Sequence, residues 1–173
     1  MLLGAPNNKC AKSLSGNGPP REDQWPKQRN QNPNAYSLTM ALTIEDKLAI
    51  HELASAYCHL IDAGRGPEWA DLFTEDGVFE IVDLITTEGR EALVANATVF
   101  PEMMPGVRHI VHNVWVTEGS TTDTATMLAY LSNLRAGDKT EWVQTGIYKD
   151  DLVRTPDGWR FARRTLTLDG PLF

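Results

Sequence analysis

Apolar residues recur with a helical period between Thr43 and Gly64. Positions three and four residues apart share one face of a helix, so this stretch is predicted to be a helix with one buried side. Thr43 suits the N-cap, and Asp46, three residues on, completes a capping box of the acidic kind. Gly64 is expected to end the helix in the left-handed conformation. The predicted buried face consists of Ile50, Leu53, Ala54, Tyr57, Leu60 and Ile61.

Shorter elements are expected after this helix. Pro67 fits the first turn of a second, short helix that carries Trp69 and Phe73. A β-like run follows at 78–82, and residues 90–97 are predicted to form a further helix.

The second half of the chain changes to long runs that are rich in β-branched and aromatic residues. Short turn signals built from Gly, Pro, Asp and Ser separate these runs. Consecutive strands with short connections form an antiparallel meander, and helices followed by strands indicate an α+β fold with the helices on one face of the sheet. A curved sheet wrapped over a helix would leave one concave pocket. The predicted strands are 107–116, 122–134, 142–153 and 159–168.

Composition and charge both change near residue 40. Residues 1–39 contain no Val, Ile or Phe but five Pro and six Asn, and they carry five basic and two acidic side chains. Such a segment cannot bury enough apolar surface to fold, so a disordered tail or leader is predicted. Residues 40–173 are predicted to form a single domain, in which eleven basic and twenty-one acidic side chains give a net charge of −10.

These properties argue against several classes of function. The net charge of the whole chain, −7, disfavours nucleic acid as a partner, because phosphate binding needs a basic surface. The apolar runs are too short to span a membrane. Cys10 and Cys58 form neither a disulfide framework nor a C-x-x-C motif, which favours a reducing, cytoplasmic location.

Residue patterns alone give few candidates for chemistry. Phosphate-loop, dinucleotide-binding and serine-hydrolase motifs are missing from the sequence. His109 and His112 lie three residues apart, so on a strand they face opposite sides and no shared metal is expected. Alternation places His109 with Trp115 on one face and His112 with Val116 on the other, and it leaves open which histidine faces the pocket.

Asp62 stands out because it lies in the last turn of the first helix, where the helix dipole disfavours a negative charge. Two interpretations are open. The residue is either a solvated side chain at a frayed helix end or a functional carboxylate at the rim of the pocket.

Several segments resemble the SnoaL-like family of the nuclear transport factor 2-like superfamily. Residues 44–73, the two predicted helices, resemble the opening of these proteins. The run Arg-His-Ile-Val-His-Asn at 108–113 is similar to their central histidine strand, and 146–150 and 157–161 are similar to their last two strands. The resemblance covers residues 42–169. It implies a cone-shaped α+β barrel, in which a strongly curved antiparallel sheet packs on the N-terminal helices around a deep pocket.

The resemblance also implies site residues. Scytalone dehydratase, the bile-acid dehydratases and the hexachlorocyclohexane dehydrochlorinases use a histidine paired with an aspartate to remove a proton, and these match His109 and Asp62. The tyrosine of the bile-acid enzymes matches Tyr57. The arginine of the last strand matches Arg164, with Arg163 as the neighbouring candidate. His109 is then the expected base, with its ring oriented by Asp62. Tyr57 would bind a substrate oxygen, and Arg164 would stabilise negative charge.

The chain departs from its relatives at residues 130–133, where a second acid or histidine is replaced by Tyr-Leu-Ser-Asn. Ser132 can position a hydroxyl or carbonyl group but does not readily transfer a proton. The expected activity is that of a lyase or isomerase, by β-elimination or double-bond migration, on a small hydrophobic molecule that contains a ring. No cofactor or metal is expected. The predicted substrate-binding residues are Trp69, Phe73, Trp115, Tyr130, Ser132, Trp142 and Tyr148.

A second interpretation is a non-catalytic member of the superfamily, either a carrier of a hydrophobic ligand or a structural protein like the small subunits of aromatic-ring dioxygenases. Contact between Asp62 and His109 beside an open pocket would favour the enzyme, because a structural subunit needs neither side chain. The outer face of the sheet is expected to keep apolar residues, which predicts a homodimer or a larger homo-oligomer.

Overall fold

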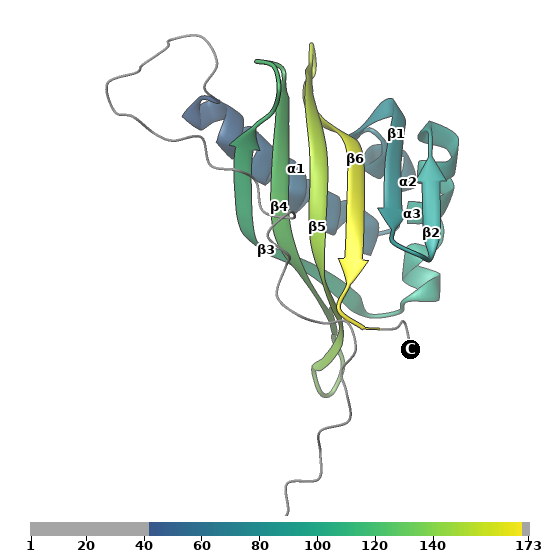
Figure 1. Ribbon diagram of the computed structural model, residues 1–173. Helices are drawn as coiled ribbons and strands as arrows, with labels where there is room; N and C mark the ends of the chain where they lie inside the picture. The colour runs from purple at the N-terminus through teal and green to yellow at the C-terminus, as the bar shows by residue number, and fades with distance from the viewer. Residues whose placement is uncertain (1–41, 171–173) are drawn as a thin grey trace, which may run out of the picture.

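The computed structural model describes residues 42–170 as an α+β fold with one six-stranded sheet (Figure 1). The predicted tail, residues 1–39, lies outside the described residues. Helix α1 runs across one face of the sheet, and α2 and α3 gather at the end that holds β1 and β2. The predicted cone-like α+β fold is confirmed, with the difference that α3 follows the first two strands instead of preceding them. The elements are α1 (Ile44–Asp62), α2 (Gly66–Ala70), β1 (Phe73–Ile81), β2 (Ile85–Glu88), α3 (Arg90–Met103), β3 (Val107–Glu118), β4 (Thr124–Arg135), β5 (Glu141–Thr155) and β6 (Gly158–Leu168).

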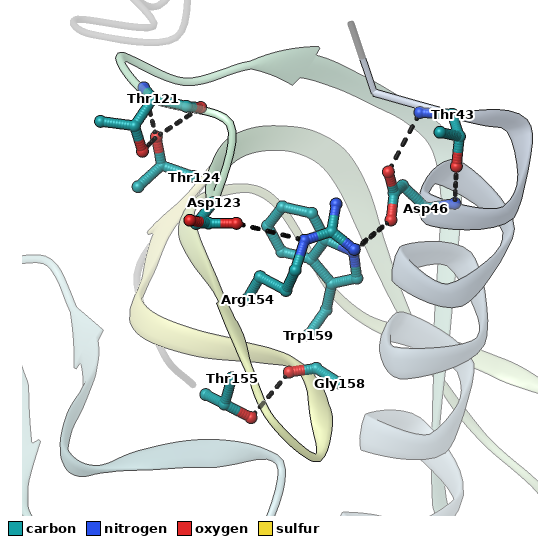
Figure 2. A network of polar contacts seen from close by, with 9 residues as sticks. All are labelled: Thr43, Asp46, Thr121, Asp123, Thr124, Arg154, Thr155, Gly158 and Trp159. Carbon is teal, nitrogen blue, oxygen red and sulfur yellow. Dashed lines mark hydrogen bonds and ion pairs between the residues drawn. The ribbon is translucent and has the colours of Figure 1, made fainter. Parts of the chain in front are cut away.

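Both predicted ends of α1 are confirmed. The Thr43 hydroxyl accepts a hydrogen bond from the Asp46 backbone N–H at 3.1 Å, and the Asp46 carboxylate accepts one from the Thr43 N–H at 3.0 Å (Figure 2). Gly64 follows the helix with a φ of 66°, the left-handed conformation that glycine adopts without strain. Asp62 is thereby fixed as the last residue of α1.

The elements between α1 and the meander are longer than the local pattern predicts. β1 begins at Phe73, not at residue 78, because Phe73 pairs with Phe161 of β6. The short strand β2 has no counterpart among the predicted elements. Helix α3 continues past the predicted end at residue 97, includes Pro101 and ends at Met103. The early start of β1 comes from pairing with the distant strand β6, which local patterns do not show, whereas β2 pairs with the adjacent β1 across a short turn.

The strand order is β2-β1-β6-β5-β4-β3. Strands β3 to β6 form the predicted antiparallel meander. β1 joins β6 in parallel, so the sheet as a whole is mixed. β3 is consequently an edge strand, and α1 packs against it.

A bulge in β3 changes which residues face α1. Asn113 and Val114 together lie opposite a single residue of β4, and Asn113 has a φ of 53°. His109, before the bulge, lies on the side that faces α1. After the bulge, Val116 belongs to the core and Trp115 faces the opposite side. The alternation that placed His109 and Trp115 on one face is therefore wrong beyond Asn113.

Aromatic side chains fill much of the space between α1 and the sheet. Tyr57 of α1 is 1% exposed, and its ring centroid lies 5.1 Å from that of Trp69 and 5.9 Å from that of Tyr148. A fully buried charged pair, Arg164 and Asp150, interrupts this apolar core. No helix within residues 42–170 is long and apolar enough to cross a membrane.

Candidate active site

Asp62 and His109 meet where the end of α1 crosses the start of β3. Asp62 Oδ1 lies 2.7 Å from His109 Nδ1, and the two side chains are only 8% and 6% exposed. The same carboxylate accepts a hydrogen bond from the His109 backbone N–H, 3.1 Å from Oδ2. Asp62 therefore holds both the ring and the backbone of a residue that lies 47 positions further along the chain.

This contact determines what the imidazole can do. A carboxylate accepts hydrogen bonds, so a neutral His109 carries its proton on Nδ1 and leaves Nε2 as an acceptor. Aromatic neighbours also hold the ring, with centroids 4.9 Å away at Phe100 and 6.3 Å away at Tyr57. An oriented imidazole with one nitrogen available is the arrangement that general base catalysis requires.

A groove of about 520 Å³ lies beside the pair, between α1 and β3. Side chains from one face of α1 form one wall, among them His51, His59 and Asp62. The other wall comes from β3 and includes His109 and Val111. The Asp62–His109 pair thus lies within the wall of a concave site that can hold a small molecule.

The groove differs in charge from the rest of the molecule. Three of the four histidines of the chain line it together with Arg108. Asp62 is the one acidic lining residue in the described part of the chain. The whole chain, in contrast, carries a net charge of −7. With histidine neutral, the charges of Arg108 and Asp62 balance, so the groove lacks the excess of negative charge that the chain as a whole carries.

Tyr57 lies between this groove and the core. Its ring is edge-on to that of His109, and its centroid lies 4.1 Å from the guanidinium carbon of Arg164. Burial raises the pKa of Tyr57 well above its ordinary value, so its phenol stays neutral. The four residues predicted to be catalytic therefore form one chain of contacts that leads from the groove into the core.

Two alternatives left open by the sequence are decided by the direction of the side chains. Arg164 is fully buried, whereas Arg163 pairs with Glu80 at 2.7 Å and is 44% exposed. His112 turns away from the groove, with its Nε2 3.0 Å from Ser132 Oγ. Arg164 and His109 are the members of the two pairs that face α1.

The seven predicted substrate-binding residues divide into two groups. One group is buried in the core around Tyr57. The other lies on the face of the sheet away from α1 or, like Trp142 at 70% exposure, in solvent. Only the first group is brought near the Asp62–His109 pair. The buried group is Trp69, Phe73 and Tyr148, and the second group is Trp115, Tyr130, Ser132 and Trp142.

The sequence analysis missed three residues of this region. His51 and His59 line the groove, and their spacing from Asp62 along one face of α1 is a signal that could have found them. Asp150 is fully buried, with Oδ1 3.4 Å from Arg164 Nε, but its partner comes from another strand and leaves no local signal. Among residues 42–170, no group of three or more His, Cys, Asp or Glu side chains could hold a metal ion.

Comparison with known proteins gives a family match and similar proteins. The model of the SnoaL-like domain matches residues 42–165. An uncharacterised protein of Mycobacterium tuberculosis (strain ATCC 25618 / H37Rv) is 29% identical over 133 residues, which are 76% of this chain and 90% of that protein.

Two solved structures from Novosphingobium aromaticivorans share the fold. An NTF2-like protein with a cystatin-like fold is 30% identical, with a TM-score of 0.66, and the match covers 72% of this chain and 82% of that one. A proposed aromatic ring hydroxylase is 34% identical, with a TM-score of 0.65, and the match covers 77% of this chain and 95% of that one.

Proposed function

This chain belongs to the SnoaL-like family, and from that premise we propose that it is a cofactor-free lyase or isomerase whose Asp62–His109 dyad removes a proton from carbon. The observation that carries the proposal is the 2.7 Å contact between Asp62 Oδ1 and His109 Nδ1 beside a groove of about 520 Å³. The substrate is a small hydrophobic molecule with a ring and with a carbonyl group that activates the neighbouring C–H bond.

In this mechanism His109 Nε2 takes the proton, and the electron pair of the C–H bond moves toward the carbonyl oxygen. The imidazolium that forms is stabilised by the Asp62 carboxylate, which keeps its own charge. In a β-elimination the imidazolium gives the proton to the departing hydroxyl group, which leaves as water. In a double-bond migration it gives the proton to another carbon. Both routes use one base that returns its proton, in keeping with a groove that holds one oriented imidazole.

A second candidate is a binding protein for a hydrophobic ligand, and one contact favours it. Asp62 also accepts the backbone N–H of His109, so the carboxylate joins α1 to β3 whether or not any chemistry takes place. A protein that only binds its ligand would keep this connection without using Nε2. The two candidates therefore differ in whether the imidazole of His109 is needed for proton transfer.

Exchange of carbon-bound hydrogen for deuterium, followed by NMR in D₂O on a panel of cyclic ketones and β-hydroxy ketones, tests the proposal. We expect the wild-type protein to accelerate exchange and His109→Ala to lose at least about 10²-fold of that rate, the low end for general base catalysis. His112→Ala is the matched control, because His112 lies on the same strand but contacts Ser132 instead of the groove. Equal rates in wild type and His109→Ala, with ligand still bound, would favour the binding protein.

A further inference from the structure

Arg108 lies in the wall of the groove without an ion pair. Five of the eight arginines at positions 42–170 pair with carboxylates, whereas Arg108, Arg135 and Arg160 have no such partner within the described residues. Of these three arginines, Arg108 is the one that lines the groove. The chain carries a net charge of −7, so acidic side chains are plentiful. A cation that meets none of them in a concave site indicates a place for a negative charge on a ligand.

The carboxylate of Asp62 does not neutralise Arg108 locally. Asp62 is 8% exposed, and its oxygens are engaged by His109, with Oδ1 2.7 Å from Nδ1 of the ring and Oδ2 3.1 Å from the backbone nitrogen. Arg108 is exposed, and in the described part of the chain it forms no ion pair with Asp62, although both residues line the groove. The two charges balance in number, but only that of Arg108 is available to a ligand.

An apolar surface lies next to this cation. Ile110 is two residues from Arg108 on the same face of β3, lines the groove and is 42% exposed. His109 faces the opposite side of the strand, but β3 is an edge strand, so side chains from both of its faces border the space beside it. One groove therefore offers a cation, an apolar contact and the oriented imidazole. Further apolar lining comes from Ala54, Val111 and Val114.

These neighbours define the chemical class of the ligand. A planar guanidinium donates two parallel hydrogen bonds to a carboxylate, a geometry that an alcohol or a ketone cannot match. An apolar ring attached to that carboxylate would cover Ile110 and remove its exposed surface from water.

We propose that Arg108 anchors the carboxylate of a flat, apolar ligand that lies in the groove with its ring against Ile110. The carboxylate oxygens accept hydrogen bonds from the guanidinium N–H groups, and the ligand supplies the counter-charge that the described residues do not. This anchor concerns binding alone and does not require His109 to act as a base. Where the inference rests on the proposed function, the substrate is a ring that bears a carboxylate as well as the activating carbonyl group.

Two histidines of the groove are the other groups that can hold an anion. His59 precedes Asp62 by three residues and His51 precedes it by eleven, which correspond to rises of about 4.5 Å and about 16 Å along α1. Both histidines are exposed and line the groove. A histidine carries a positive charge only when it is protonated, whereas arginine stays charged. Measurement at pH 8, above the range in which histidine ordinarily gains a proton, therefore isolates the contribution of Arg108.

Calorimetric titration of the full chain with 1-naphthoate and with 1-naphthalenemethanol at pH 8 tests the proposal. The two probes share one ring system and differ in the carboxylate. We expect the wild type to bind naphthoate at least about tenfold more tightly than the alcohol, because hydrogen bonds between charged groups are among the stronger polar contacts. Added salt should weaken the binding of naphthoate and leave that of the alcohol nearly unchanged.

Arg108→Gln is the decisive variant, and Arg135→Gln is the matched control. Both substitutions remove one positive charge, but Arg135 lies at the end of β4 and is not among the residues that line the groove. Arg108→Gln should abolish the preference for naphthoate over the alcohol, whereas Arg135→Gln should keep it within about twofold. Arg108→Lys keeps the charge without the planar fork, so it should retain only part of the preference.

Ser55→Trp tests whether the probes bind in the groove. Ser55 is an exposed residue of α1 that lines the groove, so an indole at this position should fill the groove without disturbing the core. The affinity for both probes should fall at least about tenfold. Naphthoate binding that is unaffected by Ser55→Trp would overturn the proposal, because the carboxylate would then bind elsewhere.

The other outcomes are equally decisive. Equal affinity of the wild type for the two probes, or no binding of naphthoate, would overturn the proposal, as would a preference that persists in Arg108→Gln or is lost equally in Arg135→Gln. If Arg108→Gln fails to fold, the wild-type preference and its reduction in Arg108→Lys decide. Deuterium exchange that depends on His109 reports the proposed function separately, so exchange without a preference for the carboxylate would refute the anchor alone.

Discussion

Two regions of the domain bury a carboxylate next to an arginine. In one region the carboxylate accepts several hydrogen bonds, and in the other it accepts none among the described residues. At the start of α1, the Asp46 carboxylate accepts hydrogen bonds from Arg154 at 2.6 Å, from the Trp159 indole at 3.1 Å and from the Thr43 N–H at 3.0 Å (Figure 2). In the core, Asp150 has a contact of 3.4 Å with Arg164 and, within the described residues, no hydrogen bond.

The number of hydrogen bonds that each carboxylate accepts, more than its burial, determines whether it is charged near neutral pH. Asp46 is 7% exposed, yet the hydrogen bond from Arg154 outweighs burial and holds its pKa far below the ordinary range. Burial without such donors raises the pKa of Asp150 to about 7. Asp46 is therefore a fixed charge that supports the fold, whereas Asp150 can change its charge near neutral pH.

The largest effect is expected at a third carboxylate, Asp62, which has donors but also touches the groove. Asp62→Asn keeps an acceptor for the His109 backbone N–H and removes the charge that stabilises an imidazolium. We expect substrate hydrogen exchange to fall by about 10²- to 10⁴-fold, while the free energy of unfolding falls by about 1 kcal/mol or less. NMR of exchange and urea unfolding measure the two quantities. If Asp62→Asn lowers the free energy of unfolding but leaves the exchange rate unchanged, Asp62 stabilises the fold, as Asp46 does, and does not take part in the chemistry.

The next largest effect is expected for Asp46→Asn, which should lower the free energy of unfolding by about 2–3 kcal/mol at pH 7. The substitution weakens the bond from Arg154 and the capping box together. Because a lowered carboxylate pKa stabilises the fold only while the group is ionised, the wild type should lose this advantage as the pH falls below about 4. Urea unfolding at pH 7 and pH 3.5 measures both effects.

Asp71→Asn is the matched control for Asp46→Asn, since Asp71 pairs with Arg90 but its side chain is 61% exposed. It should change the free energy of unfolding by about 0.5 kcal/mol or less. Equal losses in the two variants would mean that the hydrogen bonds around Asp46 add nothing beyond an ordinary surface pair.

Asp150→Asn should act with the opposite sign, as a gain on the order of 1 kcal/mol at pH 8. A raised carboxylate pKa means that the folded protein keeps a proton that the unfolded chain has released, so wild-type stability falls as the pH rises from about 4 to about 7. The difference between variant and wild type should grow through that window and level off above it. Urea unfolding from pH 4.5 to pH 8.5 measures it, and a difference that is constant with pH would contradict the argument.

The smallest effect is expected on the outer face. Arg163→Gln removes the ion pair with Glu80, whose side chains are 44% and 32% exposed, and should cost about 0.5 kcal/mol or less. Added salt should reduce that cost, because exposed charges are screened. Thermal melts in low and high salt measure it. A loss of stability that is larger than this and independent of salt would show that the exposed Arg163 contributes to the fold by more than a screened surface ion pair.

Sequence patterns were sufficient where the determinant of structure is local. The capping box of Thr43 and Asp46 and the glycine after α1 fix the helix within one turn at each end. The meander strands follow from runs of β-branched residues with turn signals between them. The parallel pairing of β1 with β6 and the bulge at Asn113 depend on segments distant in sequence, and neither leaves a local pattern.

The candidate site divides in the same way. The resemblance to the family identified Asp62 and His109, and the structure places them in contact. Trp115 and Tyr130 lie on the far side of the sheet. For Trp115 the reason is that strand alternation in β3 cannot be read across an unseen bulge. Asp150 escaped notice because its importance comes from pairing with Arg164, and the register of β5 and β6 is not encoded in either strand alone.

The contact between Asp62 and the backbone of His109 has a consequence for solubility. β3 is the last strand of the sheet, and a free edge offers unpaired backbone groups to another chain. A side chain of α1 occupies part of this edge, since the Asp62 carboxylate accepts the backbone N–H of His109. The helix thus takes the place of a further strand and hinders edge-to-edge aggregation. A change at Asp62 that removes both side-chain oxygens, such as Asp62→Ala, would also uncover part of that edge, whereas Asp62→Asn keeps an acceptor there.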